Sequence, residues 1–177
     1  TTVAVDAANV TGISGTLSNL VTLYGSSGVS NLGNETVSVS DSGSVAASDL
    51  STVASANSSG TLAASSISTI TGTADQIIAA YASGVVDSGL GDEAITVNSG
   101  TVTVAQAISL NALTTGVVTG TITSGTSIAD ILDGSSGITE SGGSNAYTIT
   151  VASGDASATA ANLNSVNDLT TAAVDAS

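Results

Sequence analysis

The stretch TTVAVDA at residues 1–7 returns near the other end of the chain as TTAAVDA at residues 170–176. Two looser copies lie between them, SSGTLAA at residues 58–64 and TTGVVTG at residues 114–120. The four copies therefore recur at nearly equal intervals along the whole chain. A period of about 56 residues is typical of repeat proteins, in which each unit buries its apolar face against the next.

The repeat divides the chain into three units and a short remainder. The units comprise residues 1–57, 58–113 and 114–169, and residues 170–177 start a fourth unit or form a joining strand. Because the fourth copy stops soon after it begins, we expect the chain to be a segment of something longer, or a unit that joins end to end.

Each unit contains two segments in which apolar residues recur with helical spacing. In the first unit the apolar residues of 17–24 stand at i, i+3, i+4 and i+7, and Thr16 occupies the helix-start position. Thr73 with Gln76 forms a capping-box pair at the same place in the second unit, and Ser127 opens the corresponding segment of the third. A weaker helical spacing precedes the end of each unit, at residues 50–53, 107–113 and 163–169.

Short strands separate these helices. An apolar run opens each unit, at residues 3–7, 61–64 and 117–122. A second strand alternates one apolar and one polar residue, at residues 37–39, 95–97 and 149–151. A turn rich in Ser, Gly, Asn and Asp follows, and leads either to the return arm of a hairpin or directly into the second helix.

The unit therefore follows the order β-α-β-α, and the predicted fold is an α/β repeat solenoid of three such units with parallel strands. A single unit of this length buries too little apolar surface to be secure, so stacking must supply the missing partner surface. The alternative is an all-β parallel solenoid, which the bias toward Ser, Thr, Val, Gly, Asn and Ala also suits. The helical spacing of residues 17–24 and 74–81 argues against this alternative.

Composition excludes several functions. The chain has 14 Asp and Glu residues, no Lys, Arg, His or Cys, and a net charge of −14. Nucleic acid is a poor partner because phosphate binding needs Lys or Arg, and a Ser nucleophile would lack its usual base. We therefore expect neither an enzyme nor a nucleic-acid-binding protein. Since 41% of the residues are hydrophobic, the chain is nevertheless expected to fold.

Divalent cations are the partners that an acidic chain suggests. Ca²⁺ binds six to eight oxygens, which acidic loops rich in Gly and Asn can provide. The candidate ligands are Asn34, Glu35, Asp41, Asp87, Asp92 and Glu93. No EF-hand loop or glycine-rich nonapeptide calcium repeat accompanies them. Solvated loop charges and helix starts are the alternative explanation of these acids, and no other cofactor is expected.

Three segments carry a family resemblance: VTVAQA at residues 102–107, ISTITGTAD at residues 67–75 and GNETV at residues 33–37. They resemble the tandem repeats of giant secreted surface proteins of cyanobacteria and some proteobacteria, which are often called adhesin-like. The resemblance implies an extracellular, structural or adhesive role and calcium as an occasional ligand. It supplies no catalytic residues.

The expected partners are copies of the chain itself, or adjacent repeats, stacked end to end. The leading expected function is a structural repeat module of an extracellular bacterial fibre or giant cell-surface protein. The alternative is an adhesin module that binds a glycan, a surface or ice, because Thr residues form regular rows at residues 101–103 and 119–123. No membrane span is expected, since the longest apolar stretch, near residues 77–82, is far too short.

Overall fold

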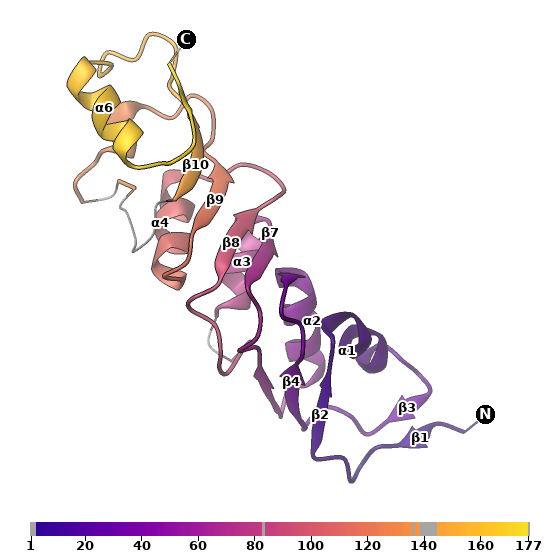
Figure 1. Cartoon of the computed structure of the whole chain (residues 1–177). Helices are drawn as coiled ribbons and strands as arrows, with labels where there is room; N and C mark the ends of the chain where they lie inside the picture. The colour runs from indigo at the N-terminus through magenta and orange to yellow at the C-terminus, as the bar shows by residue number, and fades with distance from the viewer. Residues whose placement is uncertain (1–2, 83, 136, 139–144, 177) are drawn as a thin grey trace. The chain divides into compact units, whose positions relative to one another are not determined.

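The computed structural model describes residues 3–82, 84–135, 137–138 and 145–176, and it divides into two compact units. The first compact unit contains residues 1–70 and 79–90, and the second contains residues 71–78 and 91–177. Six helices and eleven strands in three sheets make up the described part of the chain. The fold is therefore mixed α/β (Figure 1).

The elements of the first compact unit alternate short strands with two helices. In chain order they are β1 (Val5–Asp6), β2 (Gly12–Gly15), α1 (Leu17–Tyr24), β3 (Val29–Ser30), β4 (Thr36–Val39), β5 (Ser44–Ala46), α2 (Ala47–Ala56) and β6 (Thr61–Ala63). Strand β7 (Thr69–Gly72) and helix α3 (Ala74–Ala80) have residues in both compact units.

Parallel strands advance along the first compact unit by nearly constant steps. Ile13 of β2 lies beside Val37 of β4, and Val37 lies beside Leu62 of β6. Each partner thus stands about 25 residues further along the chain, within the usual range for one unit of a solenoid. The alternating pattern of β4 buries Val37 and Val39. Helices α1 and α2 pack beside each other next to these strands, as Figure 1 shows.

The second compact unit also combines a ladder of parallel strands with short helices. It contains β8 (Ala94–Val97), α4 (Val104–Leu113), β9 (Val118–Thr121), α5 (Ile128–Ile131), β10 (Ala146–Thr150), α6 (Ala160–Asp168) and β11 (Val174–Asp175). The strands β8, β9, β10 and β11 are neighbours in that order, and all three pairs are parallel.

The steps between paired strands are similar in the second compact unit. Ile95 lies beside Val118, Thr119 beside Ala146, and Ile149 beside Val174. These steps are again about 25 residues long, so one sequence repeat contains roughly two steps of the ladder. The buried core of this unit consists mainly of residues with branched side chains on β8, β9 and β10 and on the helices that follow them.

The predicted helix starts are confirmed. Thr16 Oγ1 accepts a hydrogen bond from Asn19 N–H (3.4 Å), and Ser127 Oγ accepts one from Asp130 N–H (3.1 Å). Thr73 and Gln76 exchange the two hydrogen bonds of a capping box (3.0 and 3.2 Å). These caps satisfy amide groups that the first turn of a helix leaves without an intrahelical acceptor.

Two alternatives from the sequence are wrong. The six helices exclude an all-β solenoid. The segments after the alternating strands do not return as hairpin arms, because β5 runs directly into α2 at Ala47. Val102, which forms an isolated parallel bridge with Ile122, precedes α4 in the same way.

Three strands escaped prediction: β2, β3 and β7. Strand β3 has only two residues and β2 begins and ends with Gly, so neither presents a run of alternating apolar and polar residues. Strand β7 contains a single large apolar residue, Ile70, which is too few to define an alternation. The repeat boundaries at residues 57, 113 and 169 stay a prediction, and residues 1–2 and 177 of the outer repeat copies lie outside the described residues. In the described part of the chain, no helix has the length and apolar character needed to cross a membrane.

Candidate functional site

The first candidate ligands, Asn34 and Glu35, lie in a tight turn before β4. Gly33 adopts a left-handed conformation (φ +128°), which folds the backbone so that Gly33 N–H and Asn34 N–H both donate to Glu35 Oε2 (2.9 and 3.2 Å). The hydroxyl of Tyr24, at the end of α1, donates to the same oxygen (2.9 Å). Glu35 is fully buried. Its three hydrogen bonds close the turn and connect it to α1.

The groups that contact Glu35 Oε2 are hydrogen-bond donors. Burial alone would raise the pKa of Glu35, but the hydrogen bonds from Gly33, Tyr24 and Asn34 outweigh burial and hold this pKa below its usual value. Burial and the adjacent carboxylate raise the pKa of Tyr24. Glu35 Oε1 is buried and has no hydrogen-bond partner among the described residues. A calcium ion at this place would need several further oxygen ligands, whereas the groups that contact Oε2 are N–H and O–H hydrogen-bond donors.

The side chain of Asn57, which lies just after α2 and 22 residues further along the chain, binds the backbone of Glu35. Its Oδ1 accepts from Glu35 N–H (3.0 Å), and its Nδ2 donates to Glu35 O (2.8 Å) and to Thr61 O (3.3 Å). Asn57 is 3% exposed, so both backbone groups of Glu35 are satisfied inside the protein. Gly60 packs against this pair so closely that a Cβ there would overlap Glu35 O and the amide of Asn57.

The same arrangement recurs around Glu93 in the second compact unit. Gly91 is again left-handed (φ +131°), and its N–H donates to the Glu93 carboxylate (2.9 Å to Oε2). Thr114, just after α4, takes the place of Asn57 and donates from Oγ1 to Glu93 O (2.6 Å). Asp92, between Gly91 and Glu93, is exposed.

At the third position of the series, Tyr147 replaces the glutamate. Thr170 Oγ1 donates to Tyr147 O (2.7 Å), as Thr114 does to Glu93. Tyr147 is fully buried, and its hydroxyl donates to Asn111 Oδ1 (2.7 Å). Burial raises the pKa of Tyr147. The backbone contact therefore recurs at Glu35, Glu93 and Tyr147, while the side chain at this position changes from a carboxylate to a phenol.

Two other candidate ligands, Asp41 and Asp87, bind backbone amides from a distant part of the sequence. Asp41 Oδ2 accepts from Leu17 N–H at the first residue of α1 (2.7 Å), and Asp87 Oδ2 accepts from Leu62 N–H in β6 (2.7 Å). Asp155, which the sequence did not single out, makes the equivalent contact with Ile128 N–H at the start of α5 (2.6 Å). This bond and a second from Ser157 N–H lower the pKa of Asp155.

The candidate ligands are therefore distributed over several separate contacts. Asn34 and Glu35 share one turn and Asp92 and Glu93 share another, while Asp41 and Asp87 each contact a different strand or helix. Among the described residues, no group of three or more Asp and Glu side chains could hold a metal ion together. Calcium binding stays a prediction, and the hydrogen bonds give most of these acids a structural role.

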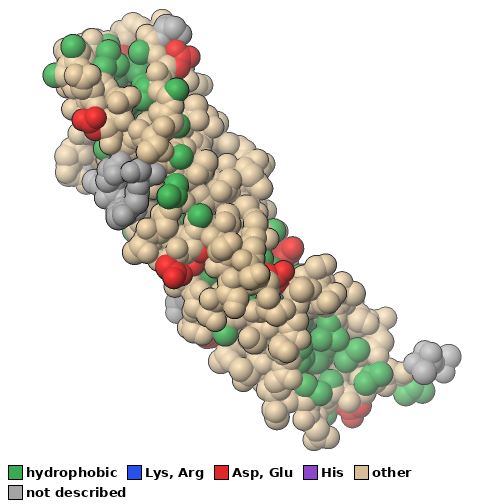
Figure 2. Space-filling view, viewed as in Figure 1, with side chains coloured by type: hydrophobic (Ala, Val, Ile, Leu, Met, Phe, Trp, Pro, Cys, Tyr) green, Lys and Arg blue, Asp and Glu red, His purple; other side chains and the backbone are tan. Residues whose placement is uncertain are grey.

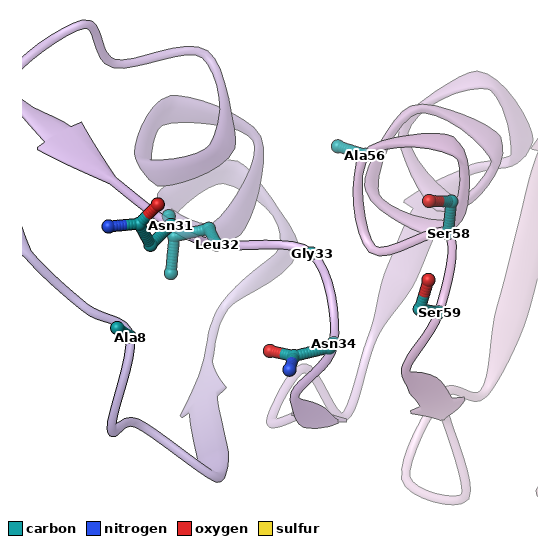
Figure 3. Close-up of a pocket in the computed structure, with 8 residues that line it drawn as sticks. All are labelled: Ala8, Asn31, Leu32, Gly33, Asn34, Ala56, Ser58 and Ser59. Carbon is teal, nitrogen blue, oxygen red and sulfur yellow. The ribbon is translucent and has the colours of Figure 1, made fainter.

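A surface hollow of about 450 Å³ lies beside the first turn. Asn31, Leu32, Gly33 and Asn34 line it from the segment between β3 and β4, and Ser58 and Ser59 lie across from them after α2 (Figure 3). Ala8 and Ala56 complete the lining, so none of the lining side chains carries a charge. The hollow therefore offers uncharged hydrogen-bonding groups to a neutral polar ligand.

The charged side chains on the face shown in Figure 2 are all acidic and form small separate groups. Hydrophobic side chains gather near the N-terminal segment, in the region of α1 and β3 (Figure 2). The large hydrophobic side chains that stand out into solvent include Val3 (77% exposed) and Val5 (63% exposed). A second gathering of hydrophobic side chains is visible in the region of α6 (Figure 2).

Sequence reasoning missed the residues that complete these contacts, namely Asn57, Asn111, Tyr24 as a partner of Glu35, and Asp155. It also missed the buried Asn145, whose Nδ2 donates to Asn111 Oδ1 (3.3 Å) and whose Oδ1 accepts from Val118 N–H (3.0 Å). The available signal was the recurrence of an Asn or Thr shortly after a helix, at residues 57, 114 and 170. No family model matches this chain, and the searches of curated proteins and of solved structures also gave no match.

Proposed function

We propose that the chain is a structural repeat module of an extracellular fibre or giant cell-surface protein, built as an α/β solenoid. The observation that carries this proposal is the parallel ladder of β2, β4 and β6 in one compact unit and of β8 to β11 in the other. Both ladders advance by about 25 residues at each strand, and a nearly constant step allows each strand to pair with the next without a new fold.

The use of the buried polar groups supports this proposal. Glu35, Glu93 and Tyr147 each present a backbone carbonyl to an Asn or Thr from the following step. The contact therefore links neighbouring steps, and it recurs while the side chain changes. The family resemblance of residues 33–37, 67–75 and 102–107 favours the same conclusion, together with an extracellular location.

A tandem chain tests the proposed function. Copies of residues 1–169 are joined end to end, with residues 170–177 kept only on the last copy, to give chains of one, two and four modules. If the modules stack as a solenoid, the denaturation midpoint and the m-value rise with module number, because every added interface stabilises its neighbours. Particle length in electron micrographs should increase linearly. Equal midpoints for all three chains would show independent domains and contradict the proposal.

A second candidate function is an adhesin module that binds a neutral glycan. The hollow lined by Asn31, Asn34, Ser58 and Ser59 favours it, since amide and hydroxyl groups can bind sugar hydroxyls without charge. Binding of one glycan class on an array by the full chain, with loss on replacing Asn34 and Ser58 by Ala, would support this function. Unchanged binding by that double variant would place the glycan elsewhere.

A further inference from the structure

Strands β1 and β11 have the same sequence, Val-Asp, and within the described residues each pairs with one other strand. Residues 1–7 and 170–176 differ at a single position, where Val3 corresponds to Ala172. In the described part of the chain, β1 forms a two-stranded parallel sheet with β3, and β11 is the outermost strand of its sheet, next to β10. The same short strand thus pairs once with a strand later in the chain, as β1 does with β3, and once with a strand earlier in the chain, as β11 does with β10.

The hydrogen bonds of β1 show which of its residues face β3. Val5 N–H donates to Gly28 O (2.8 Å), and Ala7 N–H donates to Ser30 O (2.9 Å). In a parallel ladder the backbone groups of successive residues point to opposite edges. The backbone groups of Asp6 therefore point to the edge that β3 does not cover.

In β11 the backbone groups of the aspartate, rather than those of the valine, face the paired strand. Val151 N–H donates to Asp175 O (2.8 Å), and Thr171 N–H donates to Asn145 O (2.8 Å). Asp175 corresponds to Asp6, so the edge that β11 turns toward β10 is the edge that β1 leaves uncovered. The backbone groups of Val174 point to the other edge, which in β1 is the edge that binds β3.

We propose that two copies of this chain join by strand exchange, in which β11 of one copy takes the place of β1 in a second copy. The joint has the strand order β10, β11 and then β3 of the second copy. Val174 lies beside Val29 of the second copy and Asp175 beside Ser30, in the register that Val5 and Asp6 have now. This inference rests on the proposed function, for which it supplies the joint between subunits.

The packing of β1 allows its displacement. Val3 is 77% exposed and Val5 is 63% exposed, so the apolar burial lost when β1 leaves is mainly that of the small side chain of Ala7, to which Ala176 corresponds. The side-chain contacts of Asp6, to Asn31 Nδ2 (2.8 Å) and Ala8 N–H (3.0 Å), lie at the protein surface. Asp175 brings a carboxylate of the same kind to the same register position.

Because β1 belongs to the same chain as β3, it competes with strand β11 of any other molecule and slows the exchange. Its effective concentration at β3 is about millimolar. The copies also repel each other, since each carries a net charge of −14. Exchange is therefore slow in the intact chain at low salt, and faster when the salt concentration rises or β1 is removed.

Disulfide trapping of the chain of residues 1–177 tests the joint, because this sequence has no Cys. Val29→Cys and Val174→Cys are made in separate chains and mixed at high salt under mild oxidation. Paired strands bring Cα atoms within the range that a disulfide spans. The control replaces Val174→Cys by Val117→Cys, an exposed valine (40%) of the second compact unit. The expected result is a mixed disulfide dimer that forms several-fold faster than in the control.

Deletion of residues 1–7 from the Val29→Cys chain provides a second measurement. It should accelerate the cross-link to Val174→Cys further and leave the Val117→Cys control unchanged. If this shortened chain loses its circular dichroism signal, the comparison in the chain of residues 1–177 decides alone. Cross-linking to Val174→Cys at the control rate in every folded pair would overturn the proposal.

The tandem chains distinguish this failure from failure of the proposed function. Rising stability of the tandem chains without trapping of Val29→Cys by Val174→Cys would leave the repeat module standing and remove strand exchange. Trapping without any gain in tandem stability would instead retain the exchange and contradict the stacked module.

Discussion

At the scale of the residue, the acidic side chains act mainly as acceptors for nearby amide and hydroxyl groups. Glu35 accepts three hydrogen bonds on one carboxylate oxygen, and Asn57 binds both backbone groups of the same residue. Hydrogen bonds to a charged acceptor are stronger than those between neutral groups. The turn before β4 therefore depends on the ionised state of Glu35.

Glu35→Gln tests this dependence on ionisation. Because the pKa of Glu35 in the folded protein lies below its usual value of 4.5, its ionisation stabilises the fold above that pH, and this contribution is lost as the pH falls through the folded-state pKa. Glu35→Gln should lower the free energy of unfolding near pH 7, and its difference from the natural chain should shrink below about pH 4.5. Urea denaturation at a series of pH values measures this difference. A difference independent of pH would contradict the role of the charge, and Asp92→Asn controls for removal of an exposed charge.

Gly60→Ala tests the close approach of two steps in the first compact unit. A Cβ at residue 60 would overlap Glu35 O and the Asn57 amide, so the backbone or the amide must move. We expect a loss of about 1–3 kcal/mol in the free energy of unfolding, as for other overpacked positions. Gly43→Ala is the matched control, because a Cβ there has no neighbour within 4 Å. Equal midpoints for the two variants in urea would disprove the close packing.

At the scale of the element, helix starts are fixed both locally and from a distance. Thr16 binds Asn19 N–H within α1, while Asp41, 24 residues further along the chain, binds Leu17 N–H. Asp155 binds Ile128 N–H at the start of α5 in the same way. A carboxylate at a helix N-terminus also interacts favourably with the helix dipole. Asp41 and Asp155 therefore fasten α1 and α5 to turns that lie 24 and 27 residues further along the chain.

Asp41→Ala should lower the free energy of unfolding by about 1–2 kcal/mol, as expected for loss of a helix cap. The loss should be the same in calcium and in chelator, because the contact of Asp41 is with an amide. Asp92→Ala is the control, since Asp92 is an exposed residue of the same candidate ligand set. A loss for Asp41→Ala that appears only in calcium would identify Asp41 as a metal ligand.

At the scale of the whole molecule, charge opposes folding and association. The many carboxylates, with no Lys, Arg or His to balance them, repel one another, and salt screens this repulsion beyond a Debye length of about 8–10 Å. Self-repulsion of this kind destabilises a compact state. The stability of the chain must therefore come from its apolar ladder and its buried hydrogen bonds.

Raising NaCl from about 10 mM to about 500 mM should increase the melting temperature by several degrees, through screening alone. Calorimetry in CaCl₂ at matched ionic strength then separates screening from specific binding. A further increase in calcium that a chelator reverses would establish a calcium site and favour a calcium-stiffened module. A melting temperature that does not respond to NaCl would show that repulsion is unimportant.

The sequence by itself determined the features that depend on neighbours close along the chain. The caps at Thr16, Thr73 and Ser127, the helices that follow them and the alternating strands before the second helices are all local patterns. The sequence repeat also identified the strand at the end of the chain as a copy of the first. Local hydrogen bonds and apolar spacing are visible in one short window of sequence, so these predictions succeeded.

Only the tertiary structure decided which distant residues meet. It paired Asn57 with Glu35 and Asp41 with Leu17, across 22 and 24 residues, and thereby showed that candidate metal ligands bind the backbone. It also spaced the paired strands by about 25 residues and showed that, among the described residues, β1 pairs with β3 and β11 pairs with β10 through opposite edges. The register between stacked strands sets these contacts, and register follows from the packing of the whole core rather than from any short segment.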